Sequence, residues 1–195
     1  MTKRLIAGVF WAVTGWRLVT EPAPRSPTIL VGAPHTSNWD FILMLGIAWK
    51  LGIRIRWLGK ESLFRGWRGP VMRSLGGIPV DRDAPGEVVG DLVRQVSADS
   101  ATAVVITPDG TRGAHTHWKS GFYRLAEQTG LPVTLGYVDR PTRTTGLGPT
   151  IVITGDVTAD MDRIRDFYRD KSGLRPEARV EPRLRSESGS ESGSE

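Results

Sequence analysis

The sequence contains no cysteine, which excludes disulfide bonds, thiolate metal ligands and a cysteine nucleophile. It has no apolar run of the roughly 20 residues that a helix needs to span a bilayer. It also has no lysine- and arginine-rich run and no RNA-binding signature, which argues against nucleic acid as a partner. We therefore expect a chain whose stability depends on its apolar core.

The composition is that of one globular domain with a positive charge. Of the 195 residues, 39% are hydrophobic, which is enough for a single domain with a sizeable core. The formal net charge is +5, and a basic protein suits a phosphorylated ligand or an anionic membrane. We therefore expect a phosphorylated ligand or an anionic membrane as a partner.

The N-terminus carries an apolar segment, residues 5–16, which contains two tryptophans and is flanked by Lys3, Arg4 and Arg17. These features are typical of a helix that lies at a membrane interface. A helix packed against its own domain has the same pattern, and no convincing signal-peptide cleavage site follows. We expect residues 1–21 to form an interfacial helix that attaches the protein to a membrane surface.

The rest of the pattern alternates strands and helices, which indicates a single α/β domain with a mixed, mostly parallel sheet flanked by helices. The expected strands lie at residues 28–32, 53–58, 78–80, 103–106, 132–138 and 150–153. The expected helices lie at 41–49, 62–64, 70–75, 85–98, 122–128 and 160–171, with a turn-rich connection at 142–149. The domain then covers 22–171, and the polar, Ser-, Glu- and Gly-containing tail 172–195 is expected to be disordered.

The first of these strands is followed by His35 and, five residues later, by Asp40 in the first turn of the next helix. Open α/β sheets place their chemistry at this end of the strands. A carboxylate bound to one ring nitrogen of a histidine fixes the tautomer and leaves the other nitrogen as a base. The alternative is a chance pair, in which Asp40 only stabilises the helix dipole.

Two further polar clusters follow strands. Lys60 ends one strand, Arg82 follows another, and the loop 107–112 reads Thr-Pro-Asp-Gly-Thr-Arg. A glycine-bearing loop with a hydroxyl and a guanidinium can cradle an anion, although a plain Pro-Asp-Gly turn has the same sequence. Because strand ends on one edge of a sheet converge, we expect these clusters to share one site with His35.

His115 and His117 are separated by one residue, which would place both on one face of a strand. Such a pair can bind zinc together with carboxylates. No convincing further ligand lies nearby in the sequence, so we expect surface loop residues and no metal site.

Four blocks stand in order along the chain: the His35-x4-Asp40 pair, residues 59–64 with 76–82, residues 107–112, and residues 118–123 with the strand at 132–133. Together they resemble the PlsC-type lysophospholipid acyltransferase family, the 1-acyl-glycerol-3-phosphate acyltransferases. The resemblance covers residues from about 27 to 168. Asp109 departs from it, because the family usually has Glu there, and so do residues 134–136, which replace a proline-bearing block.

The resemblance implies a glycerolipid acyltransferase-like fold and an O-acyltransferase. The fatty acyl group would move from acyl-CoA or acyl-carrier protein to the free hydroxyl of a lysophospholipid, with 1-acyl-glycerol-3-phosphate giving phosphatidic acid in phospholipid biosynthesis. No metal or further cofactor is implied. The expected location is peripheral, on the cytoplasmic face of the membrane.

By the same resemblance, His35 is the general base, Asp40 orients it, and Ser37 is a helix cap rather than a nucleophile. The residues implied to bind the substrate are Lys60, Arg82, Asp109, Gly110, Thr111 and Arg112, with Asp109 holding Arg112 or a glycerol hydroxyl. Two other functions stay open. One is a lipid-binding protein that has kept the fold without activity, and the other is a thioester hydrolase that uses the same pair on water.

Overall fold

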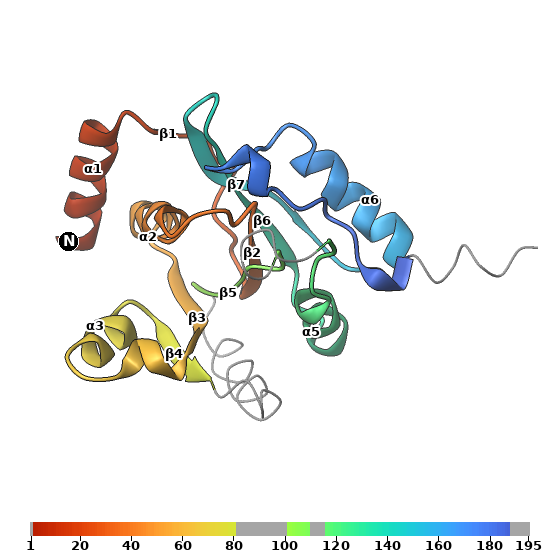
Figure 1. Ribbon diagram of the computed structural model, residues 1–195, viewed down its shortest axis with the longest axis horizontal. Helices are drawn as coiled ribbons and strands as arrows, with labels where there is room; N and C mark the ends of the chain where they lie inside the picture. Colours follow the sequence, from red (N-terminus) through yellow and green to blue (C-terminus); the bar gives the residue numbers. More distant parts are fainter. Residues whose placement is uncertain (1, 81–100, 110–115, 188–195) are drawn as a thin grey trace, which may run out of the picture.

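The structure, a computed structural model, is built around a seven-stranded sheet with helices on both faces (Figure 1). It describes residues 2–80, 101–109 and 116–187. The strands are β1 (Arg17–Leu18), β2 (Thr28–Ala33), β3 (Arg54–Lys60), β4 (Gly77–Val80), β5 (Thr102–Ile106), β6 (Val133–Asp139) and β7 (Thr144–Ile151). Their order across the sheet is β1-β7-β6-β2-β5-β3-β4, and every neighbouring pair is parallel except β6 and β7. The expected class, one α/β domain with a mostly parallel sheet, is confirmed.

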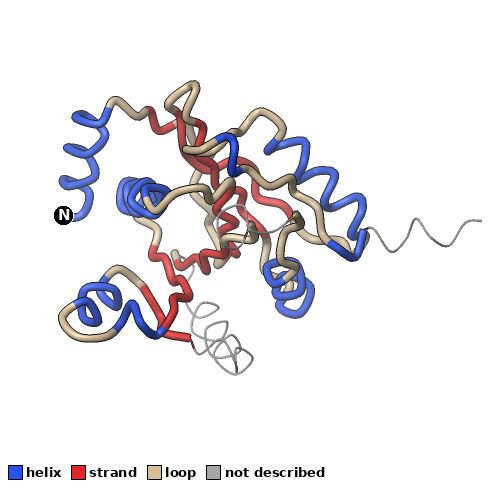
Figure 2. Tube along the Cα trace, viewed as in Figure 1, coloured by secondary structure: helices blue, strands red, loops and turns tan. Residues whose placement is uncertain are grey.

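The α-helices of the described residues are α1 (Thr2–Thr14), α2 (Trp39–Leu51), α3 (Arg68–Ser74), α5 (Gly121–Thr129) and α6 (Val157–Tyr168). Short 3₁₀ turns follow at η1 (Glu61–Phe64), η2 (Pro176–Ala178) and η3 (Arg185–Glu187). Figure 2 shows α1 and α2 on one side of the strands and α5 and α6 on the other. The helix expected at residues 85–98 lies outside the described residues.

The core has one layer on each face of the sheet, and β2 contributes to both. Ile29 and Val31 belong to the cluster that α5 and α6 cover, which also contains Phe122 and Tyr168. Leu30, between them in the sequence, belongs to the opposite cluster under α2. A strand that is buried on both faces has a continuous apolar sequence, which is why β2, β5 and β6 could be predicted.

One strand was predicted wrongly. β7 begins inside the segment 142–149, whose glycines had indicated turns. In the fold these glycines permit close packing: a Cβ at Gly146 would lie 2.0 Å from the carbonyl oxygen of Val19, and one at Gly148 would lie 2.1 Å from the ring of Phe167. Glycine within a strand often marks such an approach of another group rather than a turn.

Pro79 lies in a strand at the edge of the sheet. Proline cannot donate a hydrogen bond to a neighbouring strand, which favours the edge of a sheet. β4, which contains Pro79, is the last strand of the sheet and pairs only with β3.

The prediction of a disordered tail is wrong for residues 172–187, which pack against the domain. Val180 and Leu184 of this segment are buried in the cluster that contains α5 and α6. The segment looks polar in the sequence because its apolar residues are few and widely spaced, yet the fold brings them to the core. Residues 188–195 lie outside the described part of the chain.

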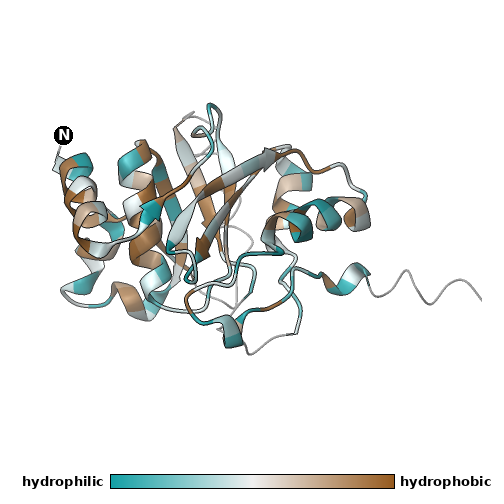
Figure 3. Cartoon of the chain, turned by 90° about the horizontal axis from the view of Figure 1, so that it is seen from above, coloured by the Kyte–Doolittle hydropathy of each residue, from teal (hydrophilic) through white to brown (hydrophobic). Residues whose placement is uncertain are grey.

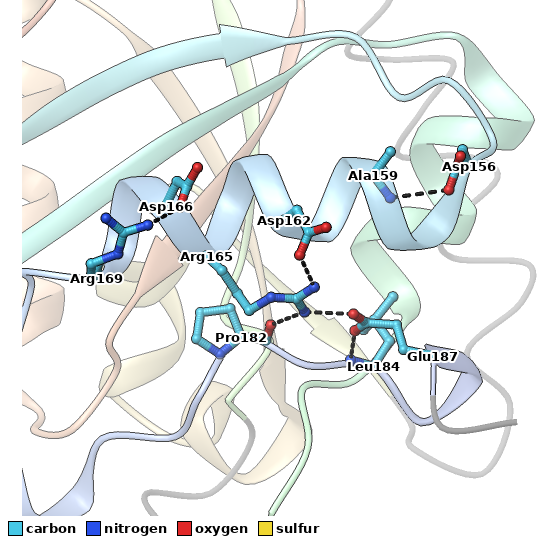
Figure 4. Close-up of polar contacts among 9 residues, drawn as sticks. All are labelled: Asp156, Ala159, Asp162, Arg165, Asp166, Arg169, Pro182, Leu184 and Glu187. Atoms are coloured by element: carbon cyan, nitrogen blue, oxygen red, sulfur yellow. Dashed lines mark hydrogen bonds and ion pairs between the residues drawn. The ribbon is translucent and has the colours of Figure 1, made fainter. Parts of the chain in front are cut away.

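One guanidinium on α6 holds the end of this segment (Figure 4). Arg165 Nη1 donates to Glu187 Oε1 at 2.5 Å and to the carbonyl oxygen of Pro182 at 3.1 Å, while Nη2 donates to Asp162 Oδ1 at 2.5 Å. Glu187 Oε2 in turn accepts the backbone N–H of Leu184 at 2.5 Å. Charge-assisted hydrogen bonds of this kind are stronger than neutral ones, so they fix the segment against α6.

Helix α1 packs one face against α2, and Figure 3 shows it on the outer side of that helix, away from the sheet. Ala7 is buried, and a Cβ at Gly46 of α2 would come within 3.1–3.3 Å of the rings of Trp11 and Phe10. Its exposed apolar residues are Leu5, Ile6, Val9 and Val13. In the described part of the chain, no helix has the length and apolarity required to cross a bilayer. α1 therefore packs on its own domain and also presents an apolar face outward.

Candidate active site

His35 and Asp40 lie in the connection between β2 and α2. β2 ends at Ala33 and α2 begins at Trp39, so the imidazole stands at a strand end and the carboxylate in a first helical turn. His35 Nδ1 lies 3.4 Å from Asp40 Oδ2. These expected positions of the two residues are confirmed.

The backbone of the same loop holds Asp40 in place. Asp40 Oδ2 accepts hydrogen bonds from the backbone N–H groups of Thr36 and Ser37, each at 2.7 Å. The carboxylate side chain is 6% exposed and the imidazole 23% exposed. A proton assigned to Nδ1 of His35 faces this fixed carboxylate, which leaves Nε2 to accept a proton from a substrate.

Asp109, which follows the neighbouring strand β5, holds the backbone of this loop by a hydrogen bond. Its Oδ2 accepts the backbone N–H of His35 at 2.9 Å, and the side chain is 1% exposed. Burial raises the pKa of Asp109, and the hydrogen bond from His35 only partly offsets this effect. Whereas the resemblance implied a contact with Arg112 or a substrate hydroxyl, the described partner of this carboxylate is the backbone of His35.

An apolar cavity of about 790 Å³ opens beside His35, between α2 and the sheet. The residues that line it include Leu30, Met44, Ala48, Trp57, Leu75 and Val105. Its charged lining residues are His35, Asp40 and Lys60. A large apolar pocket with a few converging polar groups is the usual form of a ligand site. The structure thus brings Lys60 to the same cavity as His35, because β3 and β2 both end at this edge of the sheet.

The other predicted site residues, Arg82, Gly110, Thr111 and Arg112, lie outside the described residues, as does His115. His117 is described, and its Nδ1 lies 2.9 Å from the hydroxyl of Thr116. Within residues 2–80, 101–109 and 116–187, no three His, Asp or Glu side chains are grouped so that they could hold a metal ion.

Comparison with protein families decides the family of this chain. The family described as Acyltransferase matches residues 18–136, more than half of the chain and all of the segment that carries His35, Asp40, Lys60 and Asp109. The chain belongs to the acyltransferase family. No curated protein gave a match to its sequence.

A solved structure shows the same fold for this acyltransferase. It is the crystal structure of the 1-acyl-sn-glycerophosphate (LPA) acyltransferase PlsC from Thermotoga maritima, with a TM-score of 0.59 and 18% sequence identity. The similarity covers 87% of this chain and 76% of that chain. At this identity the likeness establishes the fold, while the family establishes that an acyl donor and an acyl acceptor are the substrates.

Thr36, in the loop between β2 and α2, makes a contact that could not be predicted from the sequence. Its Oγ1 is buried and accepts the backbone N–H groups of Leu174 and Arg175, each at 3.0 Å. Gly173, with φ of +72°, lies so close that a Cβ there would be 3.0 Å from the same oxygen. The partners are 138 and 139 residues away, so nothing near Thr36 in the sequence marks this contact.

Asp139, the last residue of β6, fixes the start of the same C-terminal segment. It accepts the backbone N–H of Ser172 at 3.2 Å, the Ser172 hydroxyl at 2.9 Å and the backbone N–H of Thr142 at 3.3 Å, and also the Thr142 hydroxyl. Burial disfavours the ionised carboxylate, but these hydrogen bonds outweigh burial and lower the pKa of Asp139.

The variant Asp139→Asn is expected to lose about 1–3 kcal/mol of unfolding free energy at pH 7, the cost of removing hydrogen bonds from a buried charge. Because folding lowers the pKa of Asp139, its stabilisation is complete above the unfolded pKa and is lost as the pH falls through the folded pKa. Urea unfolding at pH 7 and in acid, below about pH 4, should show the penalty shrinking in acid. Asp170→Asn, at an exposed position, is the control. An equal penalty at both pH values would contradict this account.

Proposed function

We propose that this acyltransferase moves a fatty acyl group from a thioester, acyl-CoA or acyl-carrier protein, to the free hydroxyl of a lysophospholipid. The proposed acceptor is 1-acyl-glycerol-3-phosphate, and the product is phosphatidic acid. The observation that carries the proposal is the His35–Asp40 pair at an apolar cavity of about 790 Å³ that also contains Lys60. Such a cavity suits a hydrocarbon chain whose reactive end lies at the imidazole.

The proposed reaction needs a base, because an alcohol is a poor nucleophile at neutral pH. Nε2 of His35 takes the proton of the acceptor hydroxyl while its oxygen attacks the thioester carbonyl carbon. The carbon–sulfur bond then breaks, and His35 returns the proton to the departing sulfur, which leaves as a thiol. Asp40, fixed by two backbone N–H groups, keeps the ring oriented and stabilises the imidazolium that forms. No covalent acyl-enzyme is required.

The acceptor phosphate is proposed to bind cations at the same edge of the sheet. Lys60 lines the cavity with His35 and supplies a point charge. Arg82, Gly110, Thr111 and Arg112 are proposed to add to this site by resemblance. Asp109 acts on His35 instead, since its carboxylate is buried against the His35 backbone.

Peripheral membrane attachment through α1 is part of the proposal. Leu5, Val9 and Val13 are spaced by four residues, so they share one face of the helix, and each is more than half exposed. An exposed apolar stripe with Lys3 and Arg4 at its start is typical of a helix that lies in the headgroup region.

The triple variant Leu5→Gln, Val9→Gln, Val13→Gln is expected to bind anionic vesicles at least about tenfold more weakly, because interfacial binding scales with buried apolar area. It leaves Ala7 and Trp11, which pack on α2, unchanged. Vesicle co-sedimentation measures the effect. Val152→Gln, which alters an exposed apolar residue just after β7, is the control. Unchanged co-sedimentation of the triple variant would rule out this face as the attachment surface.

The experiment that tests the proposed reaction offers a panel of lysophospholipids with a labelled acyl thioester and reads products by mass, while free thiol is measured in parallel. We expect thiol release that depends on the acceptor and a diacylated product. Thiol release without any acceptor would instead indicate a thioester hydrolase that uses the same pair on water. Lipid binding without thiol release would indicate a binding protein that keeps only the fold.

A further inference from the structure

A second cavity, of about 340 Å³, lies next to the loop that carries the catalytic pair. Ser37 of this loop and Trp39 at the start of α2 line it, but it shares no lining residue with the cavity beside His35. Four parts of the chain that are distant in sequence meet there: the end of α1, the start of α2, the turn after β6, and the C-terminal segment. It is therefore a separate site formed only in the folded protein.

Two guanidinium groups belong to this cavity. Arg140 and Arg175 both line it, and among the residues that the structure describes no carboxylate does. Arg140 Nη1 donates to the carbonyl oxygen of Leu174 at 3.2 Å, which anchors the side chain and leaves its other donors available. The Arg175 side chain makes no ion pair or hydrogen bond within the described part of the chain. Two like charges at one cavity favour an anion, and the planar arginine fork matches a phosphate.

The remaining walls are mostly apolar and lie next to the surface proposed to face the membrane. Phe10 comes from α1, Trp16 follows the end of that helix, and Trp39 and Leu43 come from the start of α2. Val13, on the exposed apolar stripe of α1, precedes the lining residue Thr14. Tryptophan is favoured where a headgroup region meets hydrocarbon, because one part of its ring system is apolar and its N–H is polar. Inorganic phosphate has no apolar part that could pack against such walls, whereas a phospholipid has its glycerol and the first methylenes of its acyl chains.

We propose that this cavity binds the phosphate-bearing headgroup of an anionic membrane phospholipid. Arg140 and Arg175 hold the phosphate, and Trp16 and Trp39 contact the glycerol and upper acyl chain. Because His35 does not line the cavity, the bound lipid is distinct from the reacting one. Its binding fixes the C-terminal segment and the end of α1 to the same membrane surface, with the catalytic loop beside them.

The test compares two double variants of the full-length chain that lose the same charge. Arg140→Gln with Arg175→Gln removes the proposed site, whereas Arg124→Gln with Arg183→Gln removes two exposed arginines elsewhere on the protein. Binding is measured by co-sedimentation with phosphatidylcholine vesicles that contain phosphatidylglycerol. We expect the first pair to weaken binding by at least about tenfold and the second by far less, since a basic residue near the surface contributes on the order of fivefold. Equal losses in both pairs would show general charge attraction and overturn the site.

Arg175→Gln alone keeps the test valid if the Arg140 change disturbs the C-terminal segment, and it should weaken binding by about fivefold. Wild-type binding by both the single and the double variant would overturn the proposal. A second arm follows tryptophan fluorescence with short-chain phosphatidylglycerol or inorganic phosphate. The lipid should bind more tightly than phosphate, and equal affinities would make the site one for free phosphate and overturn the lipid assignment. No acyl donor is present and phosphatidylglycerol is not the proposed product, so these results do not depend on the proposed reaction.

Discussion

His35→Ala is expected to lower acyl transfer by about 10²–10⁴-fold or more, the usual contribution of a general base. The imidazole lies at the end of β2, 3.4 Å from a carboxylate, and lines the apolar cavity proposed for the acyl chain. Alanine leaves no group there that can take the proton of an attacking hydroxyl. The rate constant kcat should fall while KM for the lysolipid stays similar, since the proton transfer, rather than binding, is lost.

The control for this variant is His117→Ala, because His117 does not line the cavity and its Nδ1 lies within hydrogen-bond distance of the Thr116 hydroxyl. It should retain wild-type turnover. Circular dichroism and the unfolding midpoint of His35→Ala should match those of the wild type, since the side chain is partly exposed. A folded His35→Ala protein with near wild-type turnover would exclude the proposed base.

Asp40→Asn is expected to cost about 10²–10⁴-fold in kcat, because the neutral amide cannot stabilise the imidazolium that forms on His35. One carboxylate oxygen of Asp40 receives two backbone N–H groups at 2.7 Å and also faces Nδ1 of His35. Asparagine has one carbonyl oxygen and no charge. It can keep the backbone hydrogen bonds only by turning its NH₂ group toward the second position of the carboxylate.

The variant Asp40→Asn should remain folded, since its remaining oxygen can accept the N–H groups of Thr36 and Ser37. Asp170→Asn, an exposed change on the same chain, serves as the control for turnover. In the double variant His35→Ala with Asp40→Asn, the second substitution should add little to the first, because the carboxylate acts through the ring. A further large loss in the double variant would mean that Asp40 acts on the substrate by another route.

Local sequence explains why the positions of His35 and Asp40 could be predicted. The strand before His35 is continuously apolar, the helix after Asp40 is apolar enough to be recognised, and only four residues separate the two side chains. Contacts across so short a connection follow from local geometry. The edge position of β4 was predictable for a similar reason, since Pro79 lacks a backbone donor.

Contacts between distant residues could not be predicted in the same way. Asp109 reaches the backbone of His35 across 74 residues, and Thr36 reaches Leu174 across 138. The glycines of β7 had indicated turns until the fold showed Val19 and Phe167 packed against them. The segment 172–187 looked disordered because its few apolar residues cannot form a core by themselves. They are buried only in the folded domain, where Arg165 holds the segment against the core.

The sequence by itself determined the fold class, the edge of the sheet at which the candidate site lies, and the placement of His35 beside Asp40, because each follows from local patterns of apolar residues and from one short connection. Tertiary structure alone decided how the His35 loop is supported, which walls form the apolar cavity, and where Arg140 and Arg175 meet. Those features arise from hydrogen bonds and packing between residues far apart in the chain, and the free energy of such contacts depends on the folded arrangement rather than on any local sequence pattern.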